Sequence, residues 1–323
     1  MDGFEQLVSV HRGPRVESVH RVAAVVADAA GIRESWGDPS MIVYPRSSCK
    51  MLQALPLVEA EAVSDPRRIA LACASHQGAP MHTELAAAWL ADEGWSEPDL
   101  RCGAHMPYAD DARDALVRAG AAPSQLYNNC SGKHAGFLAL NRRLRGGAEY
   151  VEVDHPVQRA VREAFEDATG MASPDWAVDG CSAPNFATAL DALARAMARF
   201  AAARDADRRG RAMVRLREAM ALHPALVAGE GRACTELMEA AGGGAALKTG
   251  AEGVFVAILP RQGLGVALKV ADGATRAAEA AIAAILVRLG ALDAAHPAAR
   301  RRMHGPILNR RGIETGRIEV ALG

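Results

Sequence analysis

The pattern of hydrophobic and polar positions near the N-terminus is that of β-strands. Residues 19–31, VHRVAAVVADAAG, are rich in valine and end at a glycine turn, and residues 32–36, IRESW, follow directly. Extended runs rich in β-branched residues, joined by a short turn with glycine, are typical of an antiparallel hairpin. We therefore expect two paired strands before residue 40.

The middle of the chain changes to a helical pattern. Proline at a first helical position and glycine just past a last one mark several of these segments, for example Pro80 and Gly94. The pattern predicts helices over residues 52–63, 80–94, 112–119, 133–144, 156–169, 187–203, 211–222 and 232–241.

Strand patterns return after the glycine run at residues 242–244. ALKTG, GVFVAILP and LGVALKVADG lie around turns at Gly250 and at residues 262–263, and an alanine-rich helix is expected over residues 274–289. Terminal strands on either side of a helical middle predict an α+β fold, with an antiparallel sheet built by both ends of the chain and flanked by helices. We expect a sheet lobe from residues 1–46 and 242–323, an inserted, mainly helical lobe from residues 47–241, and an active site between them.

Composition and charge narrow the function. The 323 residues are half hydrophobic, enough for a large core, and the formal net charge is only −1 with lysine and arginine scattered along the chain. Scattered charge argues against nucleic acid and favours a small-molecule substrate. The N-terminal stretch has no apolar region of the signal-peptide kind, and no run approaches the roughly 18 to 20 apolar residues of a membrane span. We expect a cytoplasmic protein with no membrane contact, whose six cysteines are reduced thiols or metal ligands.

Two short motifs suggest a serine nucleophile activated by lysine. Ser47 stands three residues before Lys50, which places both on one face of a helix, and Lys248 follows about 200 residues later in a K-T-G sequence. S-x-x-K with K-T-G is found in serine β-lactamases and penicillin-binding proteins. The alternative for Ser47 is a helix N-cap, and for Lys248 a solvated lysine. Ser48 is the competing hydroxyl, but its i+2 spacing from Lys50 puts it on another helix face.

Five segments give the chain a wider resemblance. They are RSSCKMLQALPLVE (46–59), LACASHQG (71–78), NNCSGKHAGFLA (128–139), VDGCSAP (178–184), and HPALVAGEGRACTELM (223–238) leading to KTGAEGVF (248–255). Together they resemble the Rhizobium etli-type (class 3) L-asparaginases, whose fold is like that of serine β-lactamases and glutaminases. The likeness runs from about residue 7 to residue 290.

The resemblance implies two serine-lysine pairs, a zinc ion and a homodimer. The pairs are Ser47 with Lys50 and Ser75 with Lys248, and no organic cofactor is expected. Its zinc ligands fall on three residues, Cys130, Lys133 and Cys181. One departure is Cys49, where a small residue such as alanine is expected.

The residues themselves leave the metal site partly open. Thiolates suit zinc, which favours Cys130 and Cys181, whereas free buried thiols are the alternative. Ordinary zinc chemistry favours His134 as the third ligand, but the resemblance favours Lys133, which binds only as the neutral amine. Asp179 either bonds a ligand or zinc-bound water, or caps a turn. The remaining thiols, Cys49, Cys73, Cys102 and Cys234, are expected in the core, and His76 is expected to be structural.

The predicted reaction is hydrolysis of L-asparagine to L-aspartate and ammonia through an acyl-enzyme on Ser47. Lys50 takes the serine proton, and Ser75 with Lys248 relays a proton to the leaving ammonia. Two alternatives stay open. One is another serine amidohydrolase or acyltransferase of the same fold, such as a glutaminase or a β-lactamase-like enzyme. The other is a zinc- or ligand-binding protein without catalysis.

Overall fold

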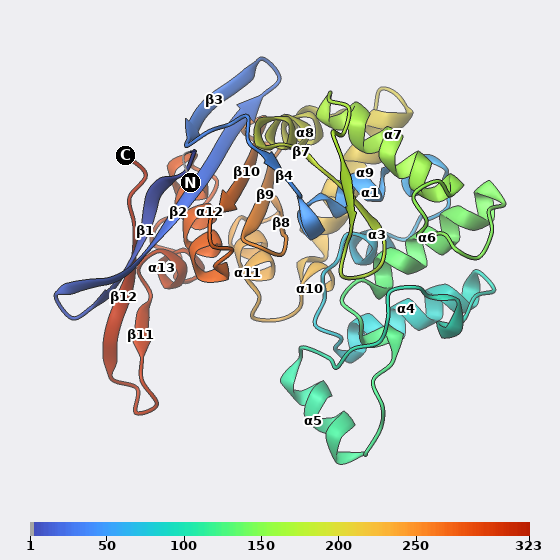
Figure 1. Ribbon diagram of the computed structural model, residues 1–323, viewed down its shortest axis with the longest axis horizontal. Helices are drawn as coiled ribbons and strands as arrows, with labels where there is room; N and C mark the ends of the chain where they lie inside the picture. Colours follow the sequence, from blue (N-terminus) through green and yellow to red (C-terminus); the bar gives the residue numbers. More distant parts are fainter. Residues whose placement is uncertain (1–2) are drawn as a thin grey trace. The chain divides into compact units, whose positions relative to one another are not determined.

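An eight-stranded sheet is built from both ends of the chain (Figure 1). The structure is a computed structural model that describes residues 3–323. The strand order is β11-β12-β1-β2-β10-β9-β8, with β3 also paired to β2, and every pairing is antiparallel. The strands are β1 (Glu5–Arg12), β2 (Arg15–Asp28), β3 (Gly31–Trp36), β8 (Ala246–Thr249), β9 (Val254–Leu259), β10 (Leu264–Val270), β11 (Pro306–Leu308) and β12 (Glu314–Val320).

Helices bury both faces of the centre of this sheet. Every position of β9 is buried, although successive side chains of a strand point to opposite faces. Helices α8 (Leu190–Ala202) and α12 (Thr275–Arg288) both contact β9 and β10. Gly265 in β10 allows α8 to approach closely, because a Cβ there would clash with the helix backbone at Met197 and Ala198. The sheet is therefore the core of the first compact unit, residues 1–48, 188–202 and 236–323.

The same unit contains three smaller elements. Helix α13 (Pro297–His304) packs on β12 and α12, and β4 (Ile42–Val43) pairs with β7 (Thr188–Ala189). Helix α11 (Ala233–Ala240) begins in the second unit and ends in the first.

The second unit, residues 49–187 and 203–235, is mainly helical. It contains the hairpin β5 (Trp176–Val178) and β6 (Pro184–Phe186), and its helices begin as the sequence signals require. Proline occupies the first turn of α3, α4 and α7, and Gly170 ends α7 with φ +70°. The helices are α1 (Lys50–Gln53), α2 (Leu55–Glu59), α3 (Pro66–Ala72), α4 (Pro80–Asp92), α5 (Asp110–Arg118), α6 (Ser131–Leu144), α7 (Pro156–Thr169), α9 (Arg208–Leu222) and α10 (Pro224–Val227), with 3-10 turns η1 (Arg46–Cys49), η2 (Glu97–Asp99) and η3 (Gln125–Tyr127).

The predicted fold class is confirmed. The N- and C-terminal strands form one antiparallel sheet, and the chain between them is mostly helical. The prediction of a single helix over residues 52–63 is wrong: the chain forms α1 and then α2. Pro56 has no N–H to donate to Leu52, so one helical hydrogen bond is missing at this junction.

The observed unit boundaries differ from the predicted lobes at one helix. The junctions at residues 48/49 and 235/236 lie close to the predicted 46/47 and 241/242. Helix α8, expected in the helical lobe, belongs to the sheet unit, because its buried residues pack on β10, β2 and β9. Strands β1, β11 and β12 and helices α3, α10 and α13 were not anticipated individually.

Within residues 3–323, no helix combines the length and the apolar character needed to cross a membrane.

Candidate active site

Ser75 lies in an extended loop that follows α3. Two main-chain hydrogen bonds hold the loop: Ser75 N donates to the Val227 carbonyl (2.9 Å), and His76 N donates to the Asn129 carbonyl (3.2 Å). Ser75 is half-buried, whereas the residues on either side of it are buried. The loop therefore fixes the Ser75 backbone and leaves its hydroxyl partly accessible.

Lys50 begins α1 and is fully buried. Its Nζ donates to the Ala74 carbonyl, to Ser75 Oγ (3.0 Å) and to Cys130 Sγ (3.1 Å). The partners of this amine are thus a carbonyl, a hydroxyl and a thiol, none of them a carboxylate. The resemblance paired Ser75 with Lys248; the contact observed in the helical unit is between Ser75 and Lys50.

The two serines before Lys50 differ in their surroundings. Ser48 is buried and donates from Oγ to the Pro45 carbonyl at 2.7 Å, whereas Ser47 is half-buried. Arg46, directly before Ser47, has a φ of +53°, a left-handed conformation that costs a non-glycine residue about 1–2 kcal/mol. Strained backbone persists where the surrounding structure enforces it, and such positions cluster at functional sites.

Lys248 stands on β8, and the end of this strand lies next to the turn at residues 45–48 within the sheet unit. A Cβ on Gly250 would lie 2.6 Å from the Pro45 carbonyl oxygen and 3.1 Å from Ser48 N, so the glycine of K-T-G permits the end of β8 to pack against this turn. Lys248 is fully buried, and its Nζ donates to the Thr249 carbonyl at 2.7 Å. Its catalytic role stays a prediction.

Cys130 directly precedes α6 and lies beside the Ser75 loop. A Cβ on Gly132 would lie 2.5 Å from the Leu71 carbonyl oxygen, so glycine lets α6 pack directly on α3. Asn128 Oδ1 accepts from Cys130 N (2.9 Å), and Asn129 Oδ1 accepts from Cys130 Sγ (3.0 Å). The two asparagines of the NNCSGKH segment thus fix the thiol.

Cys181 lies at the tip of the β5–β6 hairpin. A tight turn forms the tip: Ser182 N donates to the Asp179 carbonyl (2.8 Å), and Ser182 adopts φ +71°. The turn presents the buried Cys181 to α6, where Lys133 Nζ lies 2.9 Å from Cys181 Sγ. Cys130, Lys133 and Cys181, which we call the sulfur cluster, are therefore brought together by the fold.

The electrostatics of the sulfur cluster separate its two thiols. The pKa of Cys130 lies well above its usual value, because the thiol shares a hydrogen bond with Cys181 and is buried. The pKa of Cys181 lies well below, because it accepts that hydrogen bond and faces the Lys133 amine. Burial alone would lower the pKa of Lys133, but the Cys181 and Cys130 sulfurs raise it above its ordinary value. These shifts favour a Cys181 thiolate beside a Lys133 ammonium.

The comparison with protein families decides what this site belongs to. The family described as L-asparaginase II matches residues 8–320. The chain belongs to the L-asparaginase II family. This confirms the resemblance drawn from the five segments, and membership makes the protein an amidohydrolase of the asparaginase type with a small-molecule substrate.

Solved structures and curated proteins add less to the L-asparaginase II assignment. The chain is similar to a β-lactamase from Mycobacterium bovis (TM-score 0.36, 15% identity, 83% of this chain and 94% of that chain covered). It is also similar to a protein from Bacteroides dorei DSM 17855 provisionally described as a β-lactamase (TM-score 0.40, 13% identity, 77% and 84% covered). No curated protein matches the chain. The fold described above rests on the strand order and not on these likenesses.

A metal in this L-asparaginase II chain would need the Lys133 amine. Within residues 3–323, no three His, Cys, Asp or Glu side chains gather closely enough to hold a metal ion by themselves. The sulfur cluster nevertheless offers two soft sulfurs and a nitrogen, the donor types that zinc prefers. Beside it, the buried His134 Nε2 has no hydrogen-bond partner in the described structure. The donor set fits a zinc ion.

His134 and Asp179 lie beside the cluster with different surroundings. His134 is buried, which lowers its pKa, and the nearby Cys181 acts in the opposite direction. Its Nδ1 lies 2.9 Å from the hydroxyl of the fully buried Tyr150, a residue that sequence reasoning missed because no motif contains it. Asp179 is half-buried, accepts from Gly180 N at Oδ1 (2.9 Å), and interacts electrostatically with Lys133.

The four remaining cysteines are buried, as expected, and His76 is buried with hydrogen-bond partners within the fold. Within the described residues, all six cysteines are buried and none of them forms a disulfide. Burial raises the pKa of Cys49 to about 12. The cysteine at this position, where the resemblance leads us to expect a small residue, is therefore an unreactive thiol. His76 accepts from Gly78 N at Nδ1 (3.1 Å), lies 3.0 Å from Ser131 Oγ, and stacks on His82.

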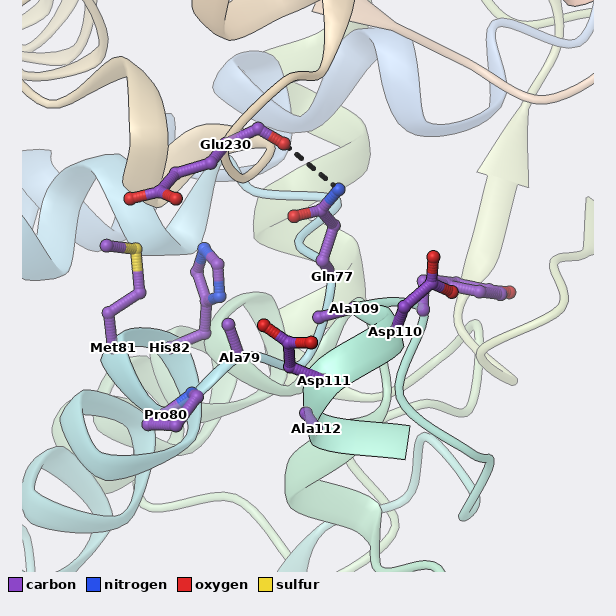
Figure 2. A pocket seen from close by; sticks show the side chains of 11 residues that line it. Gln77, Ala79, Pro80, Met81, His82, Ala109, Asp110, Asp111, Ala112 and Glu230 are labelled. Atoms are coloured by element: carbon purple, nitrogen blue, oxygen red, sulfur yellow. Dashed lines mark hydrogen bonds between the residues drawn. The ribbon is translucent and has the colours of Figure 1, made fainter. Parts of the chain in front are cut away.

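A pocket of about 580 Å³ opens beside the Ser75 loop (Figure 2). Gln77 forms part of its wall and donates to the Glu230 carbonyl at 3.3 Å, and Asp110 and Asp111 also line the pocket (Figure 2). The described lining includes none of the predicted site residues. The pocket is therefore a neighbour of the loop and not the predicted catalytic centre.

Proposed function

We propose that this family member hydrolyses L-asparagine to L-aspartate and ammonia through a serine acyl-enzyme. The observation that carries the proposal is the buried Lys50 amine, which contacts Ser75 Oγ and stands three residues after Ser47. An amine that contacts one serine hydroxyl and follows a second serine by three residues is placed to act as a general base.

The first step forms the acyl-enzyme. The Lys50 amine accepts the Ser47 proton on its nitrogen lone pair as the serine oxygen bonds to the side-chain amide carbon. Negative charge develops on the amide oxygen, and nearby N–H donors stabilise it. Collapse of this intermediate breaks the C–N bond, and the departing nitrogen takes a proton to leave as ammonia.

Ser75 and Lys248 serve the proton transfers. Ser75 Oγ, at 3.0 Å from Lys50 Nζ, provides a path from the protonated amine to the leaving nitrogen. Lys248 is assigned to the same relay, as the resemblance implies. Water then attacks the ester, Lys50 takes the proton of this water, and the products are L-aspartate and the free Ser47 hydroxyl.

Ser47 suits the nucleophile better than Ser48. The Ser48 hydroxyl donates its proton to the Pro45 carbonyl at 2.7 Å and is buried, whereas Ser47 is half-buried. A hydroxyl that already bonds to main chain must lose that bond before it attacks. Ser48 therefore supports the turn that presents Ser47.

We further propose that Cys130, Lys133 and Cys181 hold a zinc ion, with Asp179 nearby. When bound, zinc would supply a Lewis acid that orients or polarises a polar group of the substrate. Cys130 also contacts Lys50 at 3.1 Å, so the sulfur cluster and the catalytic amine share one hydrogen bond. That bond helps to hold the Lys50 amine against Ser75.

Three finer properties complete the proposal. The preferred substrate is asparagine over glutamine, the enzyme works in the cytoplasm, and it forms a homodimer. Light scattering after size-exclusion chromatography measures the oligomeric state. A monomer at working concentration would contradict the proposed homodimer. Ammonia release from asparagine, glutamine and a chromogenic lactam ranks the substrates; faster turnover of either competitor would assign the chain to the alternative amidohydrolase class.

The deciding experiment is Ser47→Ala with adduct mapping. The wild-type chain is quenched during turnover and digested, and mass spectrometry locates the aspartyl ester. We expect the ester on the peptide containing Ser47, and loss of both the ester and ammonia release in Ser47→Ala with folding and zinc content unchanged. An ester on Ser75 would reverse the roles of the two serines. A wild-type chain that binds stoichiometric zinc but releases no ammonia from any carboxamide would be the non-catalytic binding protein.

A further inference from the structure

We infer that Tyr150 fixes the tautomer of His134 with its proton on Nε2, so that this histidine faces the sulfur cluster as an N–H donor and not as a metal ligand. Tyr150 and His134 are thus positioning residues for the sulfur cluster. The inference rests on the proposed zinc site and goes beyond it, because it selects between the two nitrogen ligands that the sequence leaves open. It follows from the hydrogen bonds of one buried hydroxyl.

The Tyr150 hydroxyl has two neighbours. Arg101 N donates to Oη at 2.8 Å, and His134 Nδ1 lies 2.9 Å away. The main-chain N–H can only donate, so it uses a lone pair of the hydroxyl oxygen. The hydroxyl proton then has one acceptor available, which is His134 Nδ1.

The opposite arrangement leaves a proton without a partner. If Nδ1 carried the imidazole proton and donated it to Oη, the hydroxyl would accept twice and its own O–H would point at nothing. Tyr150 is fully buried, and a buried donor without a partner costs about 1–3 kcal/mol. The first arrangement is therefore favoured, and we assign the His134 proton to Nε2 on this basis.

This tautomer determines what His134 can do. Its Nδ1 lone pair accepts from Tyr150, and Nε2 carries a hydrogen and has no lone pair to give to a metal. The buried Nε2 has no hydrogen-bond partner in the described structure, while the imidazole interacts with the Cys181 sulfur. An N–H beside a sulfur ligand suits a supporting hydrogen bond, of the kind that orients ligands from outside the first coordination shell.

The anchoring of the hydroxyl explains why the arrangement is rigid. The Tyr150 ring packs edge-to-face with His134 (centroids 5.5 Å apart) and with Phe137 (6.3 Å), and the Tyr150 carbonyl accepts from Gln158 Nε2 at 2.8 Å. The Arg101 guanidinium bonds to the carbonyls of residues 98–100, which holds the donating main chain. Neither ring can turn without breaking these contacts.

The first test reads the tautomer directly in the wild-type chain. The full-length protein is labelled with ¹⁵N-histidine, stripped of metal, and examined by long-range ¹H–¹⁵N correlation, with His134→Asn identifying the resonances of His134. His76 gives a reference in the same spectrum, because Gly78 N donates to its Nδ1 and its Nε2 faces Ser131 Oγ. We expect His134 to show the same Nε2–H pattern as His76. An Nδ1–H pattern overturns the inference.

The second test adds Zn²⁺ and compares Tyr150→Phe with wild type. In wild type, the His134 nitrogens should keep the Nε2–H pattern after loading. Tyr150→Phe keeps the ring and removes the hydroxyl, so the tautomer is released and zinc affinity should fall about tenfold, the lower end of the range for outer-shell partners. Phe137→Leu is the control for packing and should leave the tautomer unchanged. Co²⁺ absorption of both variants reports any new imidazole ligand.

The outcomes separate this inference from the zinc proposal. Zinc binding with a His134 nitrogen coordinated overturns the inference and leaves the zinc site standing. An Nε2–H tautomer in a chain that binds no zinc leaves the hydrogen-bond assignment and removes the zinc proposal. Unchanged affinity and an unchanged tautomer in Tyr150→Phe show that the hydroxyl does not fix His134. Should that variant fail to fold, the wild-type spectra still decide.

Discussion

Two buried lysines of the helical unit, Lys50 and Lys133, differ in what surrounds their amines. Lys133 lies beside a sulfur whose pKa is strongly lowered, and the pair holds opposite charges. Lys50 meets a carbonyl, a hydroxyl and the Cys130 thiol, whose pKa is raised. A buried charge is costly unless it is paired. The comparison teaches that the partners of the two amines, and not their burial, distinguish Lys133 from Lys50. The ligand role and the proton-transfer role proposed for them follow this difference.

The test with the largest expected effect replaces each lysine by methionine, which keeps a long side chain and removes the amine. Lys50→Met should lower ammonia release by about 10³- to 10⁴-fold, because a general base is lost, while zinc content stays stoichiometric. Lys133→Met should weaken zinc by more than about 100-fold, beyond the effect of outer-shell partners. Steady-state ammonia assays and metal analysis of both variants are the measurements. If Lys50→Met lost zinc and kept its turnover rate, the two roles would be reversed.

The pH dependence of zinc binding tests the protonation of the sulfur cluster. Without metal, Cys130 and Lys133 hold protons at neutral pH because their pKa values are raised, and Cys181 does not because its pKa is lowered. Binding to all three releases one proton from Cys130 and one from Lys133. The bound state holds fewer protons, so affinity should rise with pH, by about 100-fold per unit below both pKa values.

The same measurement discriminates between the two nitrogen ligands. His134 is neutral at pH 7, because burial lowers its pKa, and would release no proton on binding. If it replaced Lys133 as the ligand, only Cys130 would lose a proton and the slope would be about tenfold per unit. Calorimetry in buffers of different ionisation enthalpy counts the released protons independently. A count near one would contradict the Lys133 assignment.

A glycine substitution tests the packing of α6, which carries Lys133, on α3, which precedes the Ser75 loop that contacts Lys50. Gly132→Ala places a methyl group against the Leu71 carbonyl, a backbone atom that can move only if α3 moves. We expect a loss of about 2 kcal/mol in the free energy of unfolding, from overpacking that outweighs the gain in helix propensity. Gly136→Ala is the control: its nearest neighbour is the flexible end of the Leu57 side chain at 3.0 Å. Urea denaturation that gives equal stabilities would show that this contact is not tight.

The sequence predicts those parts of the molecule that local patterns specify. Helix α7 was predicted over residues 156–169 with the bounds observed, because Pro156 begins it and Gly170 ends it. Two of the three proposed zinc ligands are similarly local: Cys130 and Lys133 share the start of α6. By contrast, no periodicity assigns α8 to the sheet, since that depends on packing against Gly265 and its neighbours in β10.

The contacts and the residue that sequence reasoning missed are long-range. The Lys50–Ser75 hydrogen bond joins residues 25 positions apart through the loop after α3, and nothing in either motif specifies it. Tyr150 reaches His134 from the loop before α7, where the surrounding sequence is polar and irregular. Residues of this kind become visible only when the buried hydrogen-bond donors and acceptors are paired in three dimensions.

The smallest expected effect concerns the hydroxyl that neighbours the nucleophile. Ser48→Ala removes the 2.7 Å hydrogen bond to the Pro45 carbonyl and should lower the free energy of unfolding by about 1 kcal/mol. Because Ser47 keeps its place three residues before Lys50, most of the ammonia release should remain. Ser48→Thr is the matched control, since it keeps the hydroxyl and adds a methyl group beside Gly250. Ser48→Ala could instead abolish turnover and the acyl ester as completely as Ser47→Ala. The attacking hydroxyl would then be that of the buried Ser48, and Lys50 would transfer the proton of Ser48 and not that of Ser47.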